Sequence, residues 1–256
     1  MMTGRGKTRG CYYCGKPATS REHAPPKALF RGFDCDSITV PSCGAHNNKK
    51  DFRDQAIVIG LAVGVKEAGA RSSLPDRVRS CVEGLLEEAH RVKRAVTLLP
   101  IGHGGGLPSF RLPYIEPHVR LREWARQLTA ALVFDATQQF DSHLDWARAY
   151  VDSPHWVDAS GNAIPKLQDL AHLLKQKRTE YAGLQDLPWT MGWSARPRPY
   201  PAEIYRFEFL CGEGAVVFRH TFFSSYVWYV GFDSPETTAT RLLQKATGLA
   251  GPGSRS

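Results

Sequence analysis

Hydrophobic residues recur at helical spacing over residues 75–97, behind a proline that suits the first position of a helix. The apolar positions in this stretch are Val78, Val82, Leu85, Leu86, Ala89, Val92 and Val96. This spacing predicts an amphipathic helix. Similar patterns predict further helices over residues 117–134, about 143–150 and 165–182. Residues 55–67 form an apolar run whose period does not separate a helix from a buried strand.

The pattern changes after residue 200, where three stretches are rich in β-branched and aromatic residues and are separated by short turn-forming segments. These stretches are residues 203–210, 215–223 and 225–232. They predict a small antiparallel meander, and we expect most of their aromatic rings to fill its core. The two ends of the chain, residues 1–10 and 241–256, have little to bury and predict a cationic arm and a disordered tail.

The basic residues are concentrated near the start of the chain. The formal net charge is +8, and residues 1–50, with nine basic and three acidic side chains, contribute +6 of it. Such an imbalance favours a polyanionic partner. No stretch approaches the roughly 20 apolar residues of a membrane span, and no secretion signal is present. We therefore expect a soluble cytoplasmic protein, without a membrane partner, whose six cysteines do not form disulfides.

The cysteines have the spacing of a metal site. Cys11-x-x-Cys14 and Cys43-x-x-His46 together supply three thiols and an imidazole, the donors of a closed tetrahedral zinc site. The alternative is a set of reduced cysteines with His46 on the surface. Twenty-eight residues separate the two ligand pairs, more than a simple zinc finger uses, and Cys35 within them has no knuckle partner. The spacing predicts structural zinc with a further element built between the ligand pairs.

Four segments carry a family resemblance: "CYYC", "REHAPPKALF", "ITVPSC" and "HNNKK". Together they resemble the HNH endonucleases, in the subgroup whose ββα-metal motif is framed by a pair of zinc knuckles. The match covers residues 11 to about 54. It implies a ββα-metal nuclease domain over 11–67. Together with the patterns described above, the sequence predicts an α+β protein with a basic arm over 1–10, that domain, a helical and antiparallel β region over 68–240, and a disordered tail over 241–256.

The resemblance also implies roles for individual residues. His23 would be the general base. Glu22, where the family usually has aspartate, and Asn47 would bind a catalytic Mg²⁺ or Mn²⁺, and Lys50 would face a phosphate. The middle asparagine of the family motif has no direct counterpart in this sequence, where the corresponding segment offers Asp36 or Ser37 instead. Further candidate DNA-binding residues are Lys27, Arg5, Lys7 and Arg9.

Phosphodiester hydrolysis requires residues of these types. An imidazole titrates near neutrality and suits a base, while a carboxylate and an amide oxygen suit a hard divalent cation. The sequence thus predicts a metal-dependent DNA endonuclease, with defence against foreign DNA as one context. A homo-oligomer or a partner protein of a defence system stays open. The alternatives are a non-catalytic zinc-dependent nucleic-acid-binding protein and a protein-interaction scaffold that uses the aromatic sheet.

Overall fold

The computed structural model describes a defined part of the chain. The described residues are 10–47, 54, 57–62, 74–91, 117–142, 144–151, 155–157, 163–164, 187–194, 197–212, 214–224 and 226–248. They form a mixture of helices and antiparallel sheets, consistent with the α+β class. The predicted helix over 165–182 lies outside this part, as do Arg5, Lys7, Arg9 and Lys50.

The N-terminal part is a two-stranded antiparallel hairpin followed by a helix. Strand β1 (Ser20–Ala24) pairs with β2 (Ile38–Ser42), and the short 3-10 helix η1 (Lys27–Phe30) lies between them in the sequence. Residues 57–62 then form a helix, so the apolar run over 55–67 is helical where it is described. Their side chains at 57, 58, 61 and 62 are buried, which is why the run contains so few polar residues.

The C-terminal part is a seven-stranded sheet built around the predicted meander. Its long strands are β7 (Tyr205–Gly212), β8 (Ala215–Phe222) and β9 (Tyr226–Asp233), paired antiparallel in that order. Four strands of two or three residues extend it: β3 (Tyr150–Val151), β4 (His155–Val157), β5 (Ala163–Ile164) and β6 (Thr190–Met191). The meander is confirmed, and the short strands were missed because they are too short to show an alternating pattern.

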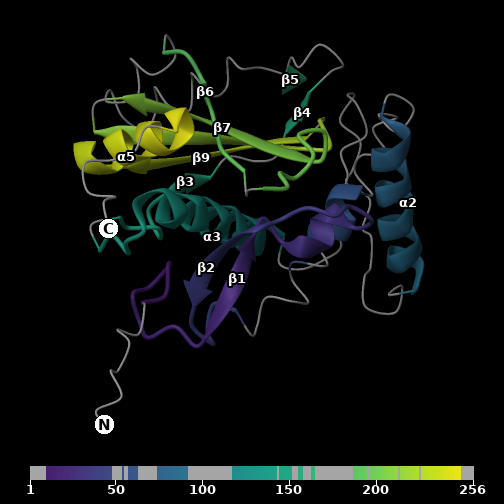
Figure 1. Ribbon diagram of the computed structural model, residues 1–256, viewed down its shortest axis with the longest axis horizontal. Helices are drawn as coiled ribbons and strands as arrows, with labels where there is room; N and C mark the ends of the chain where they lie inside the picture. The colour runs from purple at the N-terminus through teal and green to yellow at the C-terminus, as the bar shows by residue number, and fades with distance from the viewer. Residues whose placement is uncertain are drawn as a thin grey trace.

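Helix α3 (Pro117–Thr137) lies between the β1–β2 hairpin and the large sheet (Figure 1). The buried residues form one continuous hydrophobic cluster that runs from Cys11 through α3 to Leu242. The indole of Trp124 on α3 contacts the rings of Phe222 and Trp228 and donates a hydrogen bond of 2.7 Å to Asp54. The described parts of the two predicted regions therefore share one core.

A buried histidine joins α3 to the sheet. His220 on β8 is fully buried, with its Nδ1 2.9 Å from the Tyr205 hydroxyl and its Nε2 2.8 Å from the Thr129 hydroxyl. Thr129 itself donates to the carbonyl of Ala125, so it accepts from Nε2–H, and Tyr205 donates to Nδ1. Burial lowers the pKa of His220 to about 3. This imidazole is therefore neutral at pH 7 and links α3 to the sheet through its two hydrogen bonds.

Helix α2 (Asp76–Arg91) confirms the described part of the predicted helix over 75–97, and α3 confirms that over 117–134. The predicted helix over 143–150 is wrong. Turns closed by hydrogen bonds between residues three apart bury Trp146 and Ala149 and lead into β3, because pairing with β9 continues the sheet there. No helix within the described ranges is both long enough and apolar enough to cross a membrane.

The prediction of a disordered tail from residue 241 is wrong for residues 241–247, which form the end of a helix. Helix α5 (Glu236–Thr247) follows Pro235, buries Thr238 and Leu242 on one face, and ends at Gly248, which adopts a left-handed conformation with φ of 70°. A proline before the helix and a glycine after it are common helix boundaries. Both signals were present in the sequence.

Candidate metal centre

Four side chains converge at the N-terminal end of the hairpin. Each of Cys11, Cys14, Cys43 and His46 offers one ligand atom, and these four atoms lie within 4.8 Å of one another. The Cys14 and Cys43 sulfurs are 3.8 Å apart, and His46 Nδ1 is 3.6 Å from the Cys11 sulfur and 3.3 Å from the Cys43 sulfur. The cluster predicted from the spacing is therefore assembled in the fold.

These separations fit a tetrahedral zinc ion. With zinc–sulfur bonds near 2.3 Å and zinc–nitrogen bonds near 2.1 Å, two sulfurs lie about 3.8 Å apart, and a sulfur and a nitrogen about 3.6 Å apart. Burial acts to raise the pKa of the Cys43 thiol, but hydrogen bonds from the backbone N–H groups of His46 and Ala45 outweigh it and lower that pKa. The thiolate is the form that binds metal. This cluster could hold a zinc ion.

The backbone holds the two ligand pairs in tight turns. The N–H of Gly15 donates to the Cys11 carbonyl at 2.9 Å, and the N–H groups of His46 and Asn47 donate to the Cys43 carbonyl at 3.0 Å. Gly15 has a φ of 70°, a conformation that glycine adopts without steric cost. Both turns are tied to the hairpin, because Tyr12 N–H donates to the Pro41 carbonyl at 2.9 Å and Cys43 directly follows β2.

The alternation of β1 separates two of the predicted site residues. Successive side chains of a strand point to opposite faces, and here His23 is exposed while Glu22 is only 5% exposed. Both lie in the paired part of the hairpin, opposite Thr39 and Val40. The side chains of Glu22 and His23 therefore point to opposite faces of β1.

Glu22 instead links the hairpin to both metal-binding turns. Its Oε1 accepts a hydrogen bond of 3.1 Å from the Tyr12 hydroxyl, and its Oε2 accepts one of 3.3 Å from the Ser42 hydroxyl. Tyr12 lies between the first two cysteine ligands, and Ser42 precedes the third. Tyr12 and Ser42 were not among the predicted site residues, although their positions next to the ligands were a usable signal.

Asn47 folds back onto the start of β1. Its Nδ2 donates to the Ser20 hydroxyl at 2.7 Å and to the Arg21 carbonyl at 3.3 Å. Both hydrogen bonds use the amide nitrogen, so Oδ1 is the atom that would bind a cation. Ser20 and Glu22 share one face of β1, because they are two residues apart. The structure thus brings Asn47 toward the face that carries Glu22.

His23 has the protonation state of a base. Partial burial and the positive charges of Lys27 and Arg21 lower its pKa below the usual 6.5, against an opposing effect of Glu22. The imidazole is therefore neutral at pH 7 and can accept a proton. Lys27, four residues further along at the start of η1, is exposed.

No family model, curated protein or solved structure matches this chain.

Trp193 and Arg198, in the segments that precede β7, make contacts within the fold. Trp193 packs edge-on against Phe207 and donates a hydrogen bond of 2.8 Å to Asp135. Arg198 binds Asp34 and Asp36, in the segment between η1 and β2. Asp36, one of the two candidates for the middle motif position, is therefore engaged in tying the hairpin to the chain that precedes β7.

Proposed function

We propose that this chain is a metal-dependent DNA endonuclease of the HNH type. The observation that carries the proposal is the hairpin geometry. A neutral, exposed imidazole at position 23 lies on a strand whose partner runs directly into the candidate zinc cluster, with an asparagine amide immediately after the last ligand. The concentration of positive charge in the first fifty residues suits a polyanionic substrate.

The chain's own residues supply most of the chemistry. His23 would accept a proton from the water that attacks phosphorus, which requires the neutral imidazole that its lowered pKa provides. A bound Mg²⁺ or Mn²⁺ would neutralise charge on the scissile phosphate and the leaving oxygen. Asn47 Oδ1 is the proposed protein ligand to that cation. The zinc cluster would keep the hairpin and Asn47 in register.

Glu22 has a different role in this proposal from the one that the resemblance implies. Both of its oxygens accept hydrogen bonds from hydroxyls next to the zinc ligands, and its side chain is buried. We propose that Glu22 braces β1 against the two turns and so fixes the strand that carries His23.

The second candidate is a non-catalytic zinc-dependent nucleic-acid-binding protein. It would retain the metal cluster and the basic residues but would not use His23 as a base. The two functions differ in one outcome, because only the nuclease changes the DNA covalently.

The test is incubation of the purified full chain with supercoiled plasmid and magnesium or manganese, beside the His23→Ala variant. We expect the wild type to nick or linearise the plasmid and the variant to do so about 10²- to 10⁴-fold more slowly, the usual effect of removing a general base. The Asn47→Ala variant should also cleave more slowly, and a higher magnesium concentration should restore part of its cleavage rate. A wild type that binds plasmid without cutting it under either cation would favour the binding protein.

The pH dependence supplies an independent check. A base with a pKa lowered from 6.5 stays neutral until the pH falls below that value. The cleavage rate should therefore be level near pH 7 and fall on the acidic side, with a midpoint below 6.5. A rate that falls by half already above pH 7 would point to a different base.

A further inference from the structure

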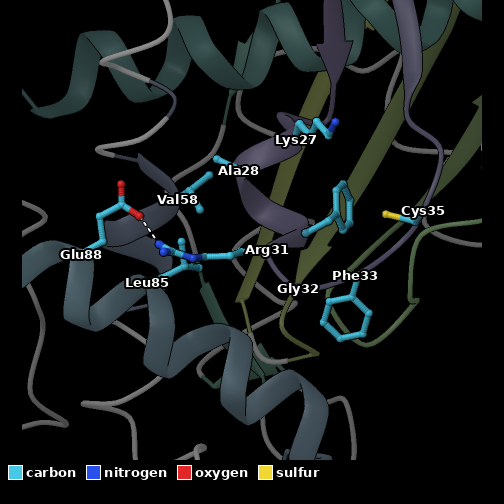
Figure 2. A pocket seen from close by; sticks show the side chains of 10 residues that line it. Lys27, Ala28, Arg31, Gly32, Phe33, Cys35, Val58, Leu85 and Glu88 are labelled. Atoms are coloured by element: carbon cyan, nitrogen blue, oxygen red, sulfur yellow. Dashed lines mark hydrogen bonds and ion pairs between the residues drawn. The ribbon is translucent and has the colours of Figure 1, made fainter.

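A cavity of about 500 Å³ opens beside η1, between the helix at residues 57–62 and α2 (Figure 2). Most of its lining is apolar, from Phe30, Phe33, Val58 and Leu85, together with the backbone of Gly32. Gly32 has a φ of 80°, and a Cβ atom added there would have no atom within 4 Å, so there is open space beside this turn. Its volume lies in the roughly 300–1,000 Å³ range of sites that bind small organic groups.

Three charged residues line the cavity: Lys27, Arg31 and Glu88. Arg31 extends toward Glu88 on α2 and forms an ion pair with it, whereas Lys27 makes no ion pair with any residue in the described ranges (Figure 2). Lys27 is also the cation whose charge acts on His23. Lys27 thus belongs both to the cavity lining and to η1, the next element along the chain after β1, the strand that carries His23.

The ring of Phe33 offers a partly exposed stacking surface. Phe33 is half-buried, and the Arg77 guanidinium of α2 lies over it, 5.1 Å from its centroid. Phe30, by contrast, is 3% exposed and stacked on Tyr200 at 5.2 Å. A flat apolar group that entered the cavity would meet the accessible part of Phe33, while a phosphate attached to it would lie near Lys27.

We propose that this cavity receives one unpaired nucleobase of the DNA strand that is cut. This inference rests on the proposed function, because the unpaired base would belong to a nucleotide beside the phosphate that is cleaved with the help of His23. An apolar cavity lined by an aromatic ring and by a lysine that forms no ion pair with any described residue suits a nucleotide, whose base is flat and whose phosphate is anionic. A base inside a duplex cannot enter such a cavity without leaving its stack, so the cavity selects nucleotides that are already unpaired.

The experiment compares the affinity of the full chain for two duplexes of the same sequence, without added magnesium or manganese. In one duplex a 2-aminopurine nucleotide is paired, and in the other it is bulged and unpaired. We expect the bulged duplex to bind roughly tenfold or more tightly, the contribution of one stacked base. The fluorescence of the 2-aminopurine should also change on binding, because the base enters a new environment.

Two matched variants separate the cavity from the rest of the surface. Ala28 lines the cavity and is exposed, so Ala28→Trp should fill the space and bring the ratio of the two affinities close to one. Ala147, exposed in a turn before β3, gives the control Ala147→Trp, which should keep the wild-type ratio. Phe33→Leu should reduce the ratio while preserving the apolar lining.

Equal affinities for the two duplexes in the wild type, or an unchanged ratio in Ala28→Trp, would overturn the cavity proposal. The same chain assayed for cleavage with magnesium then tells the two proposals apart. Cutting of both duplexes at equal rates would leave the nuclease standing without a base cavity. Preferential binding of the bulged duplex without cutting would support the cavity in a non-catalytic protein.

Discussion

Loss of a single zinc ligand should unfold the N-terminal part of this chain. The best perturbation is Cys14→Ser, because Cys14 is only partly buried, so the change removes a ligand without leaving a large cavity. Cys35→Ser is the matched control. Cys35 is a partly buried thiol in the same hairpin unit, but it does not belong to the four-atom cluster.

The expected effect is large because the bound metal would contribute more free energy than the contacts of the first knuckle with the hairpin do. Apparent zinc-binding free energies in small zinc domains are about 10–16 kcal/mol, comparable to the roughly 5–15 kcal/mol that stabilises a whole domain. The knuckle with Cys11 and Cys14 contacts the hairpin through the Tyr12 and Glu22 side chains and two backbone hydrogen bonds from Tyr12 and Thr19. These contacts would not replace the metal.

Three measurements test the effect. Elemental analysis should find one zinc per chain in the wild type and in Cys35→Ser, and much less in Cys14→Ser. Thermal unfolding should start at a clearly lower temperature in Cys14→Ser. In Cys14→Ser, the amides of Tyr12 and Thr19, which donate to the carbonyls of Pro41 and Ser42, should lose their protection from hydrogen exchange. If a metal-free chain keeps both its melting temperature and the protection of these two amides, the cluster does not depend on zinc and the reasoning is wrong.

Three further outcomes follow from the same contacts. Tyr205→Phe removes the hydroxyl that donates to His220 Nδ1 and leaves a buried acceptor unpaired, so it should lower the free energy of unfolding by about 1–3 kcal/mol in urea titrations. Because burial lowers the pKa of His220 to about 3, whereas an unfolded histidine titrates near 6.5, the wild type should lose up to about 1.4 kcal/mol per pH unit as the pH falls below 6.5. The titration of His220 should not change the free energy of unfolding above pH 6.5. In His220→Gln, the free energy of unfolding should lack the part of its pH dependence that His220 causes. Deletion of residues 1–10, which carry three basic side chains, should reduce the slope of log affinity for DNA against log salt by roughly 2–3; an unchanged slope would show that the arm makes no phosphate contact.

The features that local chemistry determines were readable from the sequence. The ligand spacing predicted the cluster of Cys11, Cys14, Cys43 and His46, because two residues between ligands are what a tight turn requires. The long strands of the meander and the amphipathic helix α2 followed from periodicity. Each of these patterns extends over enough residues, or is chemically specific enough, to be recognised without knowledge of the tertiary structure.

The features that depend on distant partners were not readable. Trp146 and Ala149 occur at a spacing that also suits a helix, but the residues that follow them pair with β9 and form β3. The orientation of Glu22 required the knowledge that "SREHA" is a paired strand, since only then does alternation assign Glu22 and His23 to opposite faces. The cavity beside η1 combines residues from three segments that no local pattern connects.

Chemical rescue of His23→Ala tests the proposed nuclease most directly. In single-turnover cleavage of a DNA duplex at saturating magnesium, the variant should be about 10²- to 10⁴-fold slower than the wild type, and added imidazole should restore part of the rate because position 23 is exposed. Arg21→Ala, on the same exposed face of β1, should gain nothing from imidazole. A His23→Ala variant that cleaves at the wild-type rate between pH 6 and 9 would contradict the assignment of His23 as the base.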